Sequence, residues 1–398
     1  MQERHSSKLV NLVKNIINYV GSVTPNYNMG DEALYKIDQD IFAKYPFRFS
    51  RITSPLRQKH SQTTLIGGGT CLPSIATIMR PTKYAYVFGA GVLDSVFHGP
   101  FEPELIDRFK LINFRLIGVR GNISKALLGD WGIDSEVIGD PCLSLKPTKV
   151  LEKRSNRIAI NVGAGFSKSS WGSRDRVLKE LSKVCSVLKN RGYEVVLIPF
   201  WKNNIQDVES LSEKVGVSIF KEWQDIEATL NLISNCKIFI GEKLHSLVFS
   251  AAANTPFIGL AYAPEHFDFA DSVGFSKFII PTTEITNEKI TDLFNDLIGN
   301  YETIQGKLAS RVNEYREKQS KFADRIRSDL ESLPEYKWAV QNNLANTFIM
   351  GVDLLINAKL HKAWGIWSKL VFSPLAPSLF YHQIQDFTFE TIERDGTL

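Results

Sequence analysis

The chain has 398 residues, of which 43% are hydrophobic and 23% are charged, and its formal net charge at pH 7 is +4. These values describe a globular protein, and the length predicts two domains of ordinary size with an appendage. The small positive excess argues against a nucleic-acid-binding protein, and no run of about eighteen apolar residues predicts a helix that spans a membrane.

The four cysteines lie far apart and form no Cys-x-x-Cys pair. Such spacing predicts neither a metal site nor a disulfide framework, and it favours the reducing cytoplasm. The polar segment Met1 to Lys14 lacks the apolar core of a signal peptide, which agrees with that location.

The first predicted strand, Asn15 to Val20, is followed by a loop and by a helix that begins near Gly30. The acidic pair Asp31-Glu32 suits the first turn of that helix, because the helix dipole is positive there. Capping alone explains these residues, but the loop is long for a simple connection. We therefore also interpret Asn28, Gly30 and Asp31 as a substrate loop.

Two later predicted strands each run into glycines. Thr63 to Ile66 is followed by Gly67-Gly68-Gly69, and Tyr84 to Phe88 is followed by Gly89-Ala90-Gly91. Glycine lets backbone approach a ligand closely, so the repetition predicts a cleft lined by bare backbone. The spacing is not the Gly-x-Gly-x-x-Gly of dinucleotide-binding turns.

A cation follows the next predicted strand. Arg120 comes directly after Arg115 to Val119, and Ser124 lies at the start of the helix that follows. Ligands of open α/β sheets bind at the carboxyl ends of strands, so Arg120 is a candidate site residue. The alternative is a structural Arg that pairs with a carboxylate across the cleft.

Lys146 to Asn156 lacks an apolar period, and we interpret it as the linker between domains. Beyond it, strands and helices alternate again. Strands are predicted at 157–162, 193–199, 236–240, 257–262 and 277–280, and helices at 175–190, 206–215, 226–234, 244–253 and 287–300. Two runs of this alternation predict two parallel sheets wrapped by helices, with strand ends that face each other across a cleft.

The second run contains the most informative stretch, Gly241 to Tyr262. Lys243, His245 and Ser246 fall in the first turn of a short apolar helix that begins at the carboxyl end of a strand. Free backbone N–H groups there favour an anion, and a cation beside a proton-transfer group suits a phosphorylated or carboxylated substrate. A His that caps the helix or packs locally is the alternative.

The C-terminal part differs from both runs. A long charged helix is predicted from Thr303 to Ser332, and the remainder carries Trp338, Trp364 and Trp367 with Lys residues interleaved. We interpret the remainder either as a helical segment that packs back on the first domain or as an amphipathic segment on a membrane surface.

An ordered set of motifs carries a resemblance to a known family. The set consists of Asn28-x-Gly30-Asp31-Glu32-Ala33, Gly67-Gly68-Gly69, Gly89-Ala90-Gly91, Val119-Arg120 with Ser124, Gly139-Asp140-Pro141, and Leu244-His245-Ser246 with the Ala-rich helix after it. Over this region the chain resembles the polysaccharide pyruvyltransferases. The resemblance implies an α/β fold of two Rossmann-like domains in the glycosyltransferase B arrangement, with a C-terminal helical extension outside the match.

The resemblance also implies a reaction. Phosphoenolpyruvate would be the donor and a sugar with two free hydroxyls the acceptor, giving a pyruvate ketal on a bacterial surface glycan. Catalysis in the family is attributed to Arg and His residues around the donor, which correspond to Arg120 and His245. Family members often have Arg two positions before the His, where this chain has Lys243; Lys can neutralise a phosphate but cannot hold it with two parallel hydrogen bonds.

The chemistry fits the residues independently. A general acid must protonate the methylene carbon of the donor, which suits His245, and a carboxylate takes a proton from an acceptor hydroxyl, for which Asp31 is the candidate. No metal and no cofactor are expected. Donor binding is assigned to Lys243, Ser246, Gly68, Gly69, Gly89, Gly91 and Ser124. Acceptor binding is assigned to Asn28, Trp171, Trp201 and Glu265, although core packing explains the two Trp rings equally well.

The predicted domains are residues 1–148 and 149–332, both Rossmann-like, and an aromatic-rich helical extension at 333–398. The predicted location is the cytoplasm, at the inner face of the cytoplasmic membrane if the extension binds there. Two alternative functions stay open. One is a nucleotide-sugar-dependent glycosyltransferase of the same fold, with Glu242 and Glu265 as its carboxylate pair; the other is a non-catalytic glycan-binding protein.

Overall fold

The computed structural model of the chain describes residues 17–21, 27–45, 47–51, 63–72, 84–93, 111, 114–149, 156–163 and 171–333, with the backbone alone for 47–51, 70 and 71. Residues 53–59 and 335–398 lie outside the described residues. The predicted packing or membrane contact of the C-terminal extension, with Trp338, Trp364 and Trp367, therefore lies outside them too.

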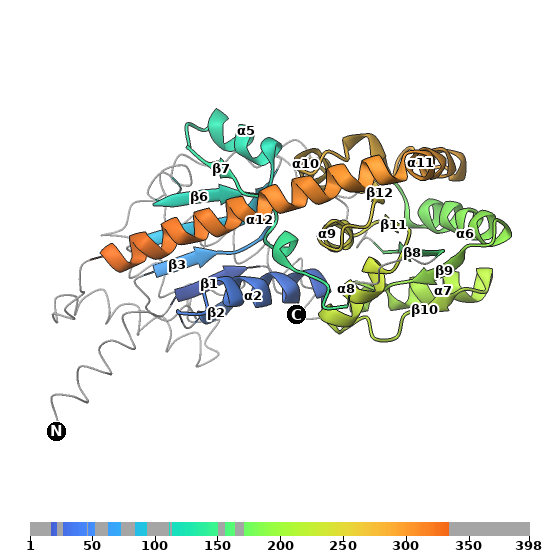
Figure 1. Cartoon of the computed structure of the whole chain (residues 1–398), viewed down its shortest axis with the longest axis horizontal. Coiled ribbons are helices and arrows are strands. Elements are labelled where there is room, and N and C mark those ends of the chain that lie inside the picture. The colour runs from blue at the N-terminus through green and yellow to red at the C-terminus, as the bar shows by residue number, and fades with distance from the viewer. Residues whose placement is uncertain are drawn as a thin grey trace, which may run out of the picture. The chain divides into compact units, whose positions relative to one another are not determined.

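The first sheet has seven strands, all of them parallel to their neighbours. They are β1 (Ile17–Gly21), β2 (Phe47–Arg51), β3 (Thr63–Ile66), β4 (Gly69–Leu72), β5 (Tyr84–Val92), β6 (Leu116–Val119) and β7 (Glu136–Val137). Six lie in the order β2-β1-β3-β5-β6-β7, and β4 pairs with β5 beside this path. Parallel strands need crossover connections, and α2 (Met29–Ile41) and α5 (Asn122–Asp130) belong to two of them (Figure 1).

The second sheet has six parallel strands. They are β8 (Arg157–Asn161), β9 (Glu194–Leu197), β10 (Ser218–Ile219), β11 (Ile238–Gly241), β12 (Phe257–Ala261) and β13 (Ile279–Pro281). Their order is β10-β9-β8-β11-β12-β13, which is the strand order of a Rossmann domain. The α-helices of this half are α6 (Arg174–Asn190), α7 (Ile205–Val215), α8 (Ile226–Ser234), α9 (Leu244–Ala252), α10 (Glu265–Ser272) and α11 (Asn287–Gly299).

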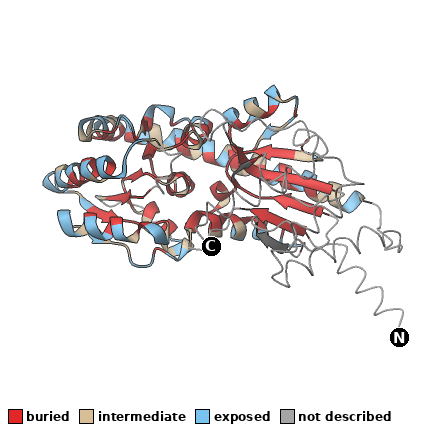
Figure 2. Ribbon diagram, turned by 180° about the vertical axis from the view of Figure 1, so that it is seen from behind, coloured by how far each residue is buried: buried red, intermediate tan, exposed pale blue. Residues whose placement is uncertain are grey.

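The buried residues lie mainly in the two sheets and on the helix faces that cover them. Figure 2 shows the strands of both sheets as buried, while the outer faces of most helices are exposed. Helix α6 has the usual amphipathic pattern and buries Val177, Leu181, Val184 and Leu188. Helix α9 is different, because eight of its nine residues are buried; it packs both on its own sheet and on η2 (Pro141–Ser144), the 3-10 turn that follows β7.

Helix α12 (Tyr301–Ser332) runs from the second sheet back to the first (Figure 1). Near its middle, the guanidinium of Arg316 donates to the carbonyls of Leu143 at 2.8 Å and Ala252 at 2.9 Å. Near its end, Asp329 accepts the hydroxyl of Tyr86 at 2.7 Å. Charged side chains of this long helix therefore form tertiary hydrogen bonds with η2, α9 and β5.

The α/β class with two parallel sheets is confirmed, and several elements differ from the prediction. Strand β5 continues through Gly89 to Val92 instead of ending at Phe88, because a register shift at Gly89, which has φ +75°, lets the strand pass through the glycines. The predicted strand 277–280 is a 3-10 turn, η4 (Ser276–Phe278), followed by β13. The sequence pattern does not predict β2, β4, β10 or α10.

The boundary expected at residue 148 falls between β7 and β8, and the division into domains stays a prediction. Cys142, Cys185 and Cys236 are buried. None of the helices in the described ranges combines the length and the apolar character needed to span a bilayer.

Candidate active site

The stretch around His245 lies at the switch point of the second sheet. β8 and β11 are adjacent there, and the strand order runs outward from them in both directions. In doubly wound sheets, ligands bind outside the carboxyl ends of such strands. Asn161 ends β8, and its Oδ1 accepts the N–H of Lys243, just after β11, at 2.9 Å. This bond joins the two strand ends and fixes the residue at which α9 begins.

A serine hydroxyl within the first turn of α9 stabilises that turn. Ser246 Oγ donates to the carbonyl of Lys243 at 2.6 Å and is fully buried. Gly241 lies against this hydroxyl, and a Cβ at that position would overlap Ser246 Oγ. The structure thus gives Ser246 a role in shaping the turn, while its donor contact stays a prediction.

His245 brings residues of both halves together. Its ring lies against Gly30 in the first turn of α2, where a Cβ on Gly30 would lie 2.6 Å from His245 Cβ and would overlap the ring. Its Nε2 lies 4.0 Å from Oδ2 of Asp140, which precedes η2. Three motifs far apart in the sequence therefore meet at one point.

The start of α2 is fastened to the second half. Asn28 Oδ1 accepts the N–H of Gly30 at 3.1 Å and caps the helix. The backbone of Asn28 forms an antiparallel bridge with Trp201, and the N–H of Met29 donates to the carbonyl of Phe200 at 2.9 Å. The side chain of Asn28 therefore acts as a cap in this structure, and its predicted acceptor contact is untested.

Lys243 lies on an aromatic ring among carboxylates. Its Nζ is 4.2 Å from the centroid of the Trp201 ring, a cation–π contact. Burial lowers the pKa of Lys243, and the negative charges of Asp31, Glu265 and Glu242 oppose that shift. Lys243 is therefore a buried cation whose charge is favoured by three carboxylates.

His245 and Asp140, which face each other at this point, both have strongly shifted pKa values. Burial lowers the pKa of His245 to about 3, and the positive charges of Arg120, Lys243 and His266 add to the effect. Burial raises the pKa of the Asp140 carboxyl to about 6, against the effect of Arg120. At neutral pH His245 is therefore neutral, and it can act as a general acid only once a bound anion raises its pKa.

Arg120 is 1% exposed, and its Nε lies 3.9 Å from Oδ2 of Asp268 in α10. The same carboxylate accepts the N–H of Ile123 at 2.9 Å, the N–H of Ser124 at 3.2 Å and the hydroxyl of Ser124 at 2.6 Å. Asp268 thus occupies the N-terminus of α5, where the sequence predicts part of the donor site. The pairing of Arg120 with a carboxylate of the other half is the structural alternative that the sequence left open.

The glycine turns of the first sheet are filled by packing. A Cβ on Gly68 would overlap Leu34, and one on Gly89 would lie 2.6 Å from Pro141 Cγ. Gly69 opens β4 with φ +105°, and Gly91 lies within β5. Side chains thus take the space that glycine leaves at Gly68 and Gly89, and the contact of these turns with a donor stays a prediction.

The two predicted Trp residues have different surroundings. Trp201 lies with Lys243, whereas the ring of Trp171 packs on Phe267 with centroids 6.1 Å apart. The N–H of Trp171 also donates to the carbonyl of Tyr262 at 2.8 Å. Packing accounts for Trp171, and its contact with an acceptor stays a prediction. Within the described ranges, no group of three His, Cys, Asp or Glu side chains is placed to hold a metal ion.

Sequence reasoning did not assign Asn161, Asp140 or Asp268. Asn161 was visible as a polar residue at the end of an otherwise apolar strand, and Asp140 as the centre of Gly139-Asp140-Pro141. Asp268 gave no signal, because its partner Ser124 lies 144 residues away and the sequence pattern does not predict α10.

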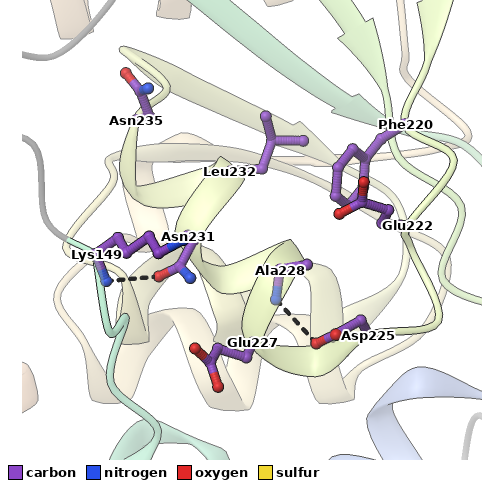
Figure 3. Close-up of a pocket in the computed structure, with 9 residues that line it drawn as sticks. All are labelled: Lys149, Phe220, Glu222, Asp225, Glu227, Ala228, Asn231, Leu232 and Asn235. Atoms are coloured by element: carbon purple, nitrogen blue, oxygen red, sulfur yellow. Dashed lines mark hydrogen bonds between the residues drawn. The ribbon is translucent and has the colours of Figure 1, made fainter.

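A pocket of about 550 Å³ lies elsewhere, over α8 (Figure 3). Its polar groups have structural partners: Asp225 caps α8 through the N–H of Ala228 at 3.0 Å, and Asn231 accepts the N–H of Lys149 at 2.9 Å. None of its lining residues belongs to the cluster around His245.

Comparison with known proteins found relatives of low sequence identity. A curated relative, the amylovoran biosynthesis protein AmsJ of Erwinia amylovora, is 22% identical over 301 residues, which cover 67% of each chain. Among solved structures, the glycotransferase of kitacinnamycin has a TM-score of 0.50 at 12% identity, with 80% of this chain and 99% of that chain covered. A UDP-glucosyltransferase from Polygonum tinctorium has a TM-score of 0.49 at 10% identity, with coverage of 80% and 99%.

The kitacinnamycin likeness bears on the fold alone and agrees with the glycosyltransferase-like arrangement that the resemblance implied. Residues 16–264 match the family model described as polysaccharide pyruvyl transferase. That range includes Asn28, Gly30, Arg120, Asp140 and His245, and it is more than half of the chain. The chain therefore belongs to the polysaccharide pyruvyl transferase family.

Proposed function

We propose that this chain transfers the enolpyruvyl group of phosphoenolpyruvate onto two hydroxyls of a sugar and so forms a pyruvate ketal during polysaccharide biosynthesis. Family membership supports pyruvyl transfer, and the relative named for amylovoran biosynthesis supports a glycan product. One observation carries the proposal: His245, from the second half, lies against Gly30 and beside Asp140, both from the first half. A proton-transfer group thus lies where the two halves meet.

The reaction needs one proton delivered and two removed. His245 gives a proton to the methylene carbon of the donor, which becomes the methyl group of the ketal. Two acceptor hydroxyls form bonds to the neighbouring carbon, and the bond from that carbon to the phosphate oxygen breaks. One hydroxyl proton returns to His245, and the other is taken by Asp31 and passes to the departing phosphate, so atoms and charge balance without a cofactor.

The charged residues have distinct proposed roles. The negative donor raises the pKa of His245, which is about 3 without it, so that donor binding and protonation of His245 are coupled. Lys243 and Arg120 supply positive charge near the donor. Asp31, which is 6% exposed in the first turn of α2, takes a proton from an acceptor hydroxyl. The acceptor sugar is assigned to the Trp201 ring, which contacts Lys243, and to Glu265, whose charge acts on Lys243.

The decisive experiment incubates the full chain with phosphoenolpyruvate and a panel of glycan acceptors, and follows inorganic phosphate and the acceptor mass. We expect phosphate release together with the gain of one pyruvate ketal on the acceptor. His245→Ala should lower turnover about 100-fold or more, because it removes the proton donor. Ketal formation at an undiminished rate in that variant contradicts the role of His245.

A parallel incubation with UDP-sugars separates the glycosyltransferase alternative. Transfer of a sugar instead of a ketal would refute the proposal. The structure gives that alternative little support, because Glu242 is fully buried and accepts the N–H of Gly163 at 2.7 Å, which does not suit a ribose-binding carboxylate. Absence of any turnover with either donor would favour a glycan-binding protein. A lipid-linked acceptor and a location at the inner face of the cytoplasmic membrane stay predictions.

A further inference from the structure

Two buried polar atoms from different halves of the molecule face each other at the site. Asp140 Oδ2 and His245 Nε2 lie 4.0 Å apart, and within the described residues neither atom has a hydrogen-bond partner. We propose that Asp140 is a positioning residue for His245: it accepts the Nε2–H of the imidazole and leaves Nδ1 as the nitrogen that transfers protons. This inference rests on the proposed function, in which His245 protonates the donor.

Asp140 is held in one orientation. Its Oδ1 accepts the N–H of Cys142 at 3.0 Å and caps η2, and its carbonyl accepts the amide of Gln319 from α12 at 2.7 Å. The side chain is fully buried, and the preceding Gly139 has φ +82°, a conformation that favours glycine. Because Oδ1 is fixed in the cap, Oδ2 is left directed at His245.

The imidazole is held from the other side. His245 is the second residue of α9, and its Nδ1 and Cγ lie so close to Gly30 that a Cβ there would overlap both. The ring thus presents Nε2 to Asp140 and Nδ1 to the first turn of α2, where Asp31 also lies. A proton on Nε2 leaves the lone pair of neutral His245 on Nδ1.

The remaining charged groups make Asp140 the partner that an imidazolium would need. The positive charges of Arg120 and Lys243, and His266, act against protonation of His245. On the far side, the carboxyl of Asp38 interacts with Asp140, and Arg120 interacts with Asp140 as well. In the described part of the chain, Asp140 is the carboxylate within 4.0 Å of the ring.

The separation of the two atoms is larger than a hydrogen bond by about 1 Å, since N–H to O bonds have heavy-atom distances near 2.9 Å. Closing that distance requires a movement of η2 against α9, which pack on each other. Asp140 would then orient the neutral imidazole before proton uptake and stabilise the imidazolium after it, as a carboxylate does for a catalytic His in other enzymes.

Nitrogen NMR of the full chain with isotopically labelled histidine reads the tautomer of His245 without turnover. The signal is assigned by its loss in His245→Gln. We expect the Nε2-protonated form in the wild type. In Asp140→Asn, Oδ1 must stay with the N–H of Cys142, so the amide Nδ2 faces His245 and donates to Nε2; we expect a switch to the Nδ1-protonated form. The same variant should lower kcat about 100-fold or more with little change in the KM for phosphoenolpyruvate.

Asp38→Asn is the matched control. Asp38 is also fully buried, accepts the hydroxyl of Tyr19 at 2.8 Å and has a raised pKa because of burial, but it is not paired with His245. Its replacement should leave the tautomer unchanged. An unchanged tautomer in Asp140→Asn, or an equal switch in Asp38→Asn, overturns the inference. A tautomer switch in a chain that never consumes phosphoenolpyruvate supports the pairing and refutes the proposed function alone.

Discussion

Replacing Gly30 by Ala tests whether His245 is held against α2. The new Cβ would lie 2.6 Å from His245 Cβ and closer to the ring. Carbon atoms in contact normally lie about 3.5 to 4.0 Å apart, so His245 must move by roughly 1 Å. Ala favours a helix over Gly by up to about 1 kcal/mol, whereas overpacking typically costs about 1 to 3 kcal/mol. We therefore expect a net loss of about 0 to 2 kcal/mol in the free energy of unfolding.

The effect on activity should exceed the effect on stability. A displacement of about 1 Å in a reacting group can lower turnover about 100-fold. The assay measures kcat for phosphoenolpyruvate-dependent phosphate release, and urea unfolding measures stability on the same sample. Gly306→Ala is the matched control, because Gly306 is an exposed helical glycine in α12 with nothing within 4 Å of an added Cβ. That variant should gain up to about 1 kcal/mol and keep full activity.

The reasoning fails if Gly30→Ala behaves like Gly306→Ala. A gain in stability with unchanged turnover would mean that the His245 ring does not rest on Gly30 in the working enzyme. A loss of stability by more than the overpacking range, with loss of all activity, would mean that the substitution disrupts the start of α2 rather than displacing one ring.

Two further predictions concern the contacts between the halves. Asp268→Ala removes the acceptor for Ser124 and Ile123 and the negative charge beside Arg120, so urea unfolding should show a loss of about 3 kcal/mol or more in the free energy of unfolding. The control Asp271→Ala, at an exposed position of the same helix, should change that free energy by less than about 0.5 kcal/mol. Equal effects of the two substitutions contradict the buried role of Asp268. The Asp140 pKa, raised to about 6, makes the folded state bind a proton more tightly than the unfolded state, so this carboxylate destabilises the fold above that pKa. Asp140→Asn should therefore exceed the wild type by up to about 3 kcal/mol near pH 8, with the difference shrinking to near zero at about pH 4. A difference that does not vary with pH contradicts the raised pKa.

The sequence alone predicts the layers of this protein and the place of its site. The alternation of apolar strands with amphipathic helices is local, so it can be read from neighbours along the chain, and both parallel sheets follow from it. The same holds for His245, because a strand, a turn and a short apolar helix in succession define the carboxyl end of β11. The short elements β2, β10 and α10 were missed, because a few residues carry too little of a period to distinguish them from loops.

The tertiary structure decided which candidate residues meet and what each is free to do. Asp268 fills the N-terminus of α5 from 144 residues away, and Pro141 fills the space beside Gly89. His245 becomes neutral, and Asp140 its neighbour, because packing of the two halves removes both from water; that cost depends on the surroundings of a group and not on the residues next to it in the chain. A motif thus locates His245, and only the packed fold determines its protonation and the groups that surround it.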